Sequence, residues 1–102
     1  ALDFGAEFER EDLDPDTRTE LFIVMGGARR DLGDTEAARV FMQKAVRAAK
    51  SPLAMARSRF ALGELLVATG DAEQAKKWLQ SAVDIDEDAV WTEASVLLES
   101  LS

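Results

Sequence analysis

The chain has 102 residues, enough for one domain with a modest core, a net charge of −8, and neither cysteine nor histidine. The lack of both residue types excludes disulfides, thiolate or imidazole metal sites and nucleophiles activated by histidine, so we expect no enzyme, no metal and no cofactor. A protein of this charge repels phosphate backbones, and nucleic acid is therefore not expected as a partner.

The N-terminal segment, residues 1–16, is the most acidic part of the chain, with seven acids and one base. Apolar residues are interspersed among the acids: Leu2, Phe4, Phe8 and Leu13. Asp14-Pro15 resembles a junction that closes a preceding helical unit, although the residues before it match such a unit poorly. Two interpretations of the segment stay open, a short helix and a loose acidic arm.

The longest apolar stretch runs from Leu21 to Ala28 and is too short to span a bilayer. No signal pattern opens the chain, and it begins with Ala rather than Met, as a piece excised from a longer protein would. We expect no membrane insertion and favour a cytoplasmic location. The abundance of Ala and Arg hints at a bacterial source.

An internal repeat with a period of 37 residues organises the middle of the chain, because the pair Gly33-Asp34 recurs as Gly70-Asp71. In both copies, apolar residues recur at helical spacing before and after this pair, which predicts two helices per copy. The residues that correspond at the same offset are Met25-Gly26 and Leu62-Gly63, Ala38 and Ala75, Met42 and Leu79, and Ala45 and Ala82.

Residues at the helix ends predict where each helix begins and stops. Gly33 and Gly70 can take the left-handed conformation that ends a helix, and the aspartate after each can accept hydrogen bonds from free amides of the next. Thr17 with Glu20 forms a capping-box pattern, and Ser51-Pro52 provides an N-cap followed by proline. Helices are expected to begin near residues 17, 35, 52 and 72. Small residues should let paired helices approach closely: Gly26, Gly63, Ala38, Ala75, Ala45 and Ala82.

Residues 88–101 predict a fifth helix, because one stripe carries Val90, Trp91, Ala94, Leu97, Leu98 and Leu101. This helix is either the first helix of an incomplete third repeat or a cap on the second, and we favour the cap. Trp78 and Trp91 are expected in the core. Asp84, Asp86 and Asp88 have the spacing of a calcium loop, but Ala89 and Ser95 replace its glycine and glutamate, so no metal site is expected.

The repeated pattern resembles the tetratricopeptide repeat over residues 18–87. The residues that carry the resemblance are Phe22, Met25-Gly26, Gly33-Asp34, Ala38, Met42 and Ala45, and then Leu62-Gly63, Leu66, Gly70-Asp71, Ala75, Leu79 and Ala82. Departures are Arg29, Leu66 and Arg59 at positions that are usually bulky or aromatic, and a period longer than the usual length of about 34 residues. The resemblance implies an all-α fold of antiparallel helical hairpins stacked in a right-handed superhelix. Its parts would be an arm at 1–16, repeats at about 18–50 and 52–87, and a capping helix at about 88–101.

The resemblance also implies that the first helix of each repeat lines a concave face that binds a protein partner. On this chain the face would be formed by Glu20, Ile23, Val24, Gly27, Arg30, Arg57, Phe60, Ala61, Glu64 and Val67. These residues favour an apolar peptide or helix as the ligand. They do not match the lysine and asparagine positions with which some family members clamp a C-terminal carboxylate.

Other interpretations of the same face remain open. It could be covered by the chain's own arm or by the second subunit of a homodimer, in which case the domain would serve self-assembly. The chain could also be a regulatory segment of a larger protein. A basic patch for an acidic partner, including the chain's own residues 7–14, is a further hypothesis, although solvated helix faces explain its residues better: Arg29, Arg30, Arg39, Arg47, Lys50, Arg57 and Arg59.

Overall fold

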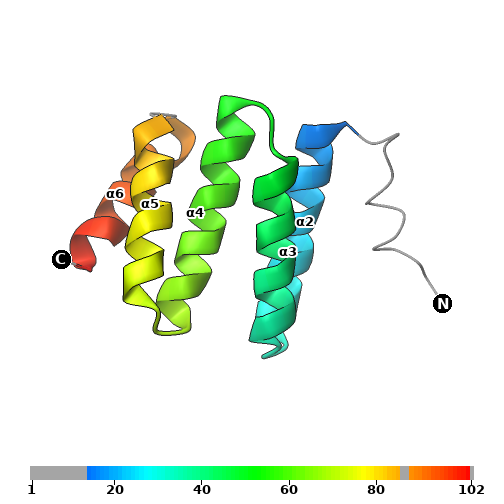
Figure 1. The fold of residues 1–102 in the computed structure, drawn as a ribbon, viewed down its shortest axis with the longest axis horizontal. Helices are drawn as coiled ribbons and strands as arrows, with labels where there is room; N and C mark the ends of the chain where they lie inside the picture. Colours follow the sequence, from blue (N-terminus) through cyan, green and yellow to red (C-terminus); the bar gives the residue numbers. More distant parts are fainter. Residues whose placement is uncertain (1–13, 86–87, 102) are drawn as a thin grey trace.

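The structure, a computed structural model, describes residues 14–85 and 88–101. Within these ranges there are five α-helices and no strand. The helices are α2 (Pro15–Asp31), α3 (Thr35–Ala48), α4 (Pro52–Ala68), α5 (Ala72–Ile85) and α6 (Asp88–Ser100). Figure 1 shows them side by side, each antiparallel to the next along the chain. The predicted all-α fold of helical hairpins is confirmed, whereas both interpretations of residues 1–13 lie outside the described residues.

Side-chain caps fix the beginnings of α3, α4 and α5 close to the predicted positions. The Asp34 carboxylate accepts a hydrogen bond from the Ala37 amide at 3.2 Å, and Asp71 accepts one from the amide of Gln74 at 3.3 Å. The Ser51 hydroxyl accepts one from the Ala54 amide at 3.1 Å. Each cap satisfies an amide that has no partner within its own helix.

The first helix begins earlier than the capping-box pattern predicted. The Asp14 carboxylate accepts hydrogen bonds from the amides of Asp16 and Thr17, both at 3.1 Å, and Pro15 is the first helical residue. Proline suits this position because its missing amide hydrogen would have no helical partner there. Asp14-Pro15 therefore opens α2. The interpretation of the pair as the close of a preceding unit concerns residues 1–13, which lie outside the described residues.

Both hairpins turn in the same way at their Gly-Asp pair. Gly33 and Gly70 have φ angles of 85° and 88°, in the left-handed region that glycine adopts without strain. The amide of Asp34 donates to the Arg29 carbonyl at 2.9 Å, and the amide of Asp71 donates to the Leu66 carbonyl at the same distance. The identical geometry explains why the pair recurs in the sequence.

Glycines inside the first helices let each hairpin close tightly. A Cβ atom on Gly63 would lie 2.8 Å from two side-chain carbons of Leu79, which has no exposed surface. A Cβ atom on Gly26 would lie 3.0 Å from the side chain of Met42. The facing Ala38 and Ala75 are also fully buried. The predicted close approach of the paired helices is confirmed at these positions.

The second hairpin stacks on the first, and α6 continues the stack. α4 contacts both α2 and α3, and α6 contacts both α4 and α5 in the same manner. The buried Val90 and Ala94 of α6 follow the buried Ala54 and Ser58 of α4 at one common offset of 36 residues. α6 therefore takes the position that the first helix of a third repeat would take.

One residue distinguishes α6 from the first helices of the two repeats. The close-packing glycine is the twelfth residue of both α2 and α4, whereas the twelfth residue of α6 is the exposed Glu99. A helix could not pack on α6 at that point as closely as α3 and α5 pack on their partners. We therefore keep the interpretation of α6 as a cap.

The core runs through both hairpins and places the tryptophans differently. Its buried residues include Ala38, Met42, Ala61, Leu62, Leu65, Leu66 and Ala75. Trp78 packs against this cluster as predicted, but Trp91 is 43% exposed, so its placement in the core was wrong. Asp86, the central residue of the calcium-like spacing, lies outside the described residues.

Candidate partner-binding face

The first helices α2, α4 and α6 lie next to one another and carry the residues predicted for a concave face. The exposed members of the predicted set are Val24, Arg57 and Glu64, and the half-buried ones are Glu20, Ile23, Gly27, Arg30, Phe60 and Val67. Ala61 is only 8% exposed and belongs to the core. The structure thus brings the predicted residues together on adjacent helices, with Ala61 turned inward.

A two-bond ion pair joins α2 to α4 on this face. Arg57 Nε donates to Glu20 Oε2 at 2.5 Å, and Arg57 Nη2 donates to Glu20 Oε1 at 2.8 Å. The pKa of Arg57 is raised above its ordinary value, mainly by these hydrogen bonds to Glu20 and further by the charges of Glu20 and Glu93, against a lowering by partial burial. A carboxylate of α6, that of Glu93, thus also acts electrostatically on Arg57.

A second, looser ion pair joins the same two helices farther along. Arg30 Nη1 lies 3.7 Å from Glu64 Oε1, with the base now on α2 and the acid on α4. Because the charge order is the reverse of the first pair, sliding α4 along α2 by one turn would separate the opposite charges of both pairs. Exposed pairs of this kind contribute only about 0.2–1 kcal/mol each, so the two pairs favour this register of the helices only modestly.

Between the ion-paired positions, α2 and α4 carry apolar residues. Val24 on α2 is 66% exposed, and Ile23 on α2 and Phe60 on α4 are half-buried. On α6, Val96 is 64% exposed and lies one turn beyond Glu93 on the same helix face. We call these four residues, Ile23, Val24, Phe60 and Val96, the apolar strip.

The match to known proteins agrees with this architecture. A family model described as tetratricopeptide repeat matches residues 18–88, more than half of the chain. The chain belongs to the tetratricopeptide repeat family. Searches of curated proteins and of solved structures gave no match. Tetratricopeptide repeats are generally protein–protein interaction modules and are typically not catalytic.

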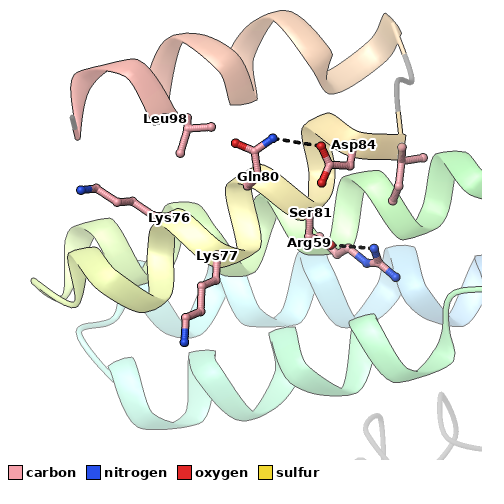
Figure 2. A pocket seen from close by; sticks show the side chains of 8 residues that line it. Arg59, Lys76, Lys77, Gln80, Ser81, Asp84 and Leu98 are labelled. Carbon is pink, nitrogen blue, oxygen red and sulfur yellow. Dashed lines mark hydrogen bonds between the residues drawn. The ribbon is translucent and has the colours of Figure 1, made fainter.

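The tetratricopeptide domain also has a hollow that lies away from the apolar strip. It measures about 740 Å³ and is framed by α5, by Leu98 of α6 and by Arg59 of α4 (Figure 2). Arg59 donates to the Ser81 hydroxyl at 2.6 Å, and Gln80 donates to Asp84 at 2.9 Å. These four polar side chains are thus bonded in two pairs, and Lys76 and Lys77 also line the hollow.

Among residues 14–85 and 88–101 there is no group of three acids placed to hold a metal ion. In the same ranges, no helix is long and apolar enough to cross a membrane.

Two residues of the face, Glu93 and Val96, were not predicted from the sequence. They belong to α6, which was recognised by its buried stripe and not aligned with the first helices of the repeats. The signal was present, because the 36-residue offset that relates Ala54 to Val90 also relates Arg57 to Glu93 and Phe60 to Val96. Aligning the buried residues of α6 with those of α4 would have found both.

Proposed function

We propose that this tetratricopeptide domain binds an apolar stretch of a protein partner along the face formed by α2, α4 and α6. The observation that carries the proposal is the pair of exposed valines in the apolar strip, Val24 at 66% and Val96 at 64% exposed. Val24 lies on α2 and Val96 on α6, the two helices that flank α4 on this face.

The energetics favour a ligand that covers the whole strip over one that fills a cavity. Burial of apolar surface contributes about 25 cal/mol per Å² before the costs of association are subtracted. A single valine therefore supplies little, and affinity must come from several aliphatic side chains buried together. An amphipathic helix or an extended segment with spaced aliphatic residues has the required shape.

The charged residues beside the strip would orient the ligand. Glu20 and Arg57 neutralise one another, but Glu93 adds a further negative charge that acts on Arg57. A ligand with a basic residue at the end nearest Glu93 would meet a complementary charge, whereas an acidic residue there would be repelled. Such contacts influence association rate and orientation more than affinity.

The test starts from peptides selected from a random displayed library for binding to the whole chain. The dissociation constant of a selected peptide is then measured by titration for the wild type, for Val24→Ser with Val96→Ser, and for Phe60→Glu. We expect binding at least about tenfold weaker for the double variant, since each lost aliphatic contact is worth roughly 1 kcal/mol, and no detectable binding for Phe60→Glu.

The matched control is Val40→Ser on α3, a valine that is also exposed, at 46%, but lies outside the face. It should bind the peptide as the wild type does, and circular dichroism should show all variants equally helical. If the single variant Val40→Ser and the double variant Val24→Ser with Val96→Ser bound the peptide with equal affinity, the proposed face would be refuted.

Self-association through the same face is the alternative, because the exposed valines would suit a second copy as well as a peptide. Sedimentation equilibrium separates the two functions. A monomeric mass at high protein concentration would leave the peptide-binding function, and a dimer abolished by the Val24→Ser, Val96→Ser exchange would replace it.

A further inference from the structure

A second surface feature lies at the outer end of the first hairpin and is independent of the apolar strip. It is a hollow of about 300 Å³ between the first turns of α2 and the last turns of α3, lined by Arg18, Phe22, Lys44, Arg47 and Ala48. We call it the basic hollow. Three of its five residues are cationic, which is unusual in a chain whose net charge is −8.

Two aromatic rings lie beneath one of these cations, Lys44. Phe22 is 3% exposed and stacks against Phe41 with 6.3 Å between ring centroids. The Lys44 ammonium lies 5.8 Å from the centroid of each ring, within the range of cation–π attraction. The hollow therefore combines an apolar base with a positively charged wall, a combination that suits a ligand carrying both aromatic and acidic groups.

Arg18 gives an independent sign that an acceptor belongs here. Its Nε atom is buried, and within the described part of the chain it has no hydrogen-bond partner. Leaving a buried donor unsatisfied costs about 1–3 kcal/mol. A carboxylate placed in the hollow would remove that penalty and form a charge-assisted hydrogen bond.

The chain itself contains a segment of the complementary composition. Residues 1–13 hold five acids and one base, and Phe4 and Phe8 lie among the acids. The segment joins α2 at Asp14, and Arg18 is only four residues farther, about one helical turn. Such a short connection keeps the acids at an effective concentration in the millimolar range near the hollow.

We propose that residues 1–13 dock in the basic hollow of their own chain, with carboxylates paired to Arg18 and Arg47 and a phenylalanine against the apolar base. The hollow holds no residue of the apolar strip on α2, α4 and α6. The proposal concerns a different face from the proposed partner-binding function, and either can fail without the other.

The test uses the absence of cysteine to place one spin label. The variant Ala6→Cys is labelled, and amide signals of the full chain are recorded by NMR with the label oxidised and reduced. We expect the signals of residues 44–48 to lose about half their intensity or more, because a tethered segment should be bound most of the time. Signals of α6 should be unchanged.

Charge variants then test the pairing. In the labelled chain, Arg47→Gln should restore much of the lost intensity, and so should added salt, which screens exposed charges. The matched control is Arg39→Gln, an arginine on the same helix that is bonded to Glu36 and lies outside the hollow. It should restore none of the lost intensity.

A mixed sample identifies whose segment is bound. It contains spin-labelled chains that give no NMR signal and isotope-enriched chains that carry no spin label. Loss of signal at residues 44–48 in the mixture would show that a second copy supplies the segment, and it would overturn docking within one chain. The proposal would also fail if these signals stayed intact in the labelled chain, if the loss appeared on the apolar strip instead, or if Arg39→Gln acted as strongly as Arg47→Gln.

Discussion

Two glycines in equivalent helices, Gly63 and Gly27, differ in whether close packing requires them. Gly63 faces Leu79 so closely that a methyl group would overlap its side chain, whereas a Cβ atom on Gly27 would find no atom within 4 Å. Glycine weakens a helix interior, so at Gly63 close packing with Leu79 offsets that weakness. At Gly27 the structure offers no such compensation.

We predict that Gly63→Ala and Gly27→Ala change stability in opposite directions. Overpacking against the buried Leu79 should make Gly63→Ala less stable by about 1–3 kcal/mol. Better helix propensity should make Gly27→Ala more stable by about 0.5–1 kcal/mol. Urea denaturation followed by circular dichroism gives both values. A stabilised Gly63→Ala protein would mean that the hairpin closes less tightly than described.

Thr19 is a polar residue with no exposed surface, and it connects the two helices of the first hairpin. Its hydroxyl lies 3.0 Å from the Pro15 carbonyl on α2 and 3.2 Å from the Ala45 carbonyl on α3, and its single proton is shared between them. The second contact gives the hydroxyl a role that no local sequence pattern indicated.

Replacement Thr19→Val keeps the shape of the side chain and removes the hydroxyl. We expect a loss of about 1 kcal/mol in the free energy of unfolding, the usual net value of one hydrogen bond. Thr92→Val on the exposed face of α6 is the matched control and should change stability little. If both exchanges had the same small effect, the contact between Thr19 and Ala45 would be energetically irrelevant.

At the scale of the helices, Asp16 fastens the beginning of α2 to the connection between α3 and α4. Its carboxylate accepts hydrogen bonds from the amides of Lys50 at 3.1 Å and Ser51 at 3.2 Å. The pKa of Asp16 is lowered from 3.8, chiefly by hydrogen bonding with the Ser51 side chain and then by these two amides, against a small raising by burial. The ionised form is therefore the one that the fold stabilises.

The stability that Asp16 contributes should depend on pH. Because its pKa is lower in the folded than in the unfolded chain, the contribution is fully present above the ordinary value of 3.8 and is lost as the pH falls through the lowered folded value. We expect Asp16→Asn to be less stable than the wild type near neutral pH, and the gap to close in acid below that range. Urea denaturation of both proteins at a series of pH values measures this difference in the free energy of unfolding. A gap that stayed constant down to the most acidic sample would argue against the ionised contact, and Glu99→Gln serves as the exposed-acid control.

Helix boundaries were predictable wherever the decisive chemistry is local. Gly33-Asp34, Gly70-Asp71 and Ser51-Pro52 end or begin helices through hydrogen bonds to residues only a few positions away, and these starts were correct. α2 begins at Pro15 and not at the capping box of Thr17, because the Asp14 carboxylate caps the helix with its hydrogen bonds.

At the scale of the whole molecule, the predicted face depended on which helices become neighbours. The repeat predicted that Glu20, Ile23 and Arg57 share a surface, and they do lie on adjacent helices. Pairing of Glu20 with Arg57 was not predicted, because it depends on how far α4 slides along α2. The same limit applies to the exposure of Trp91, since an apolar stripe on α6 does not reveal which of its edges the second hairpin covers.

Stacking of α6 should be a separable part of the fold, since it contacts only α4 and α5 among the described helices. We predict that Ala94→Glu, which would bury a charge at a site with no exposed surface, loosens α6 and destabilises the protein by about 2–4 kcal/mol. Hydrogen exchange should speed up throughout α6 and much less in α2 and α3. Thr92→Glu, at an exposed position of the same helix, should leave exchange unchanged. Uniformly faster exchange in Ala94→Glu would instead indicate one indivisible folding unit.

The charged twelfth residue of α6 has a consequence for anyone lengthening the array. Grafting a copy of α5 after α6 would bring a leucine-sized side chain against a glutamate, and the two helices would be held apart. Exchanging that glutamate for glycine first should let the grafted helix pack on α6 as α5 packs on α4, so a single codon sets whether the scaffold accepts another helix.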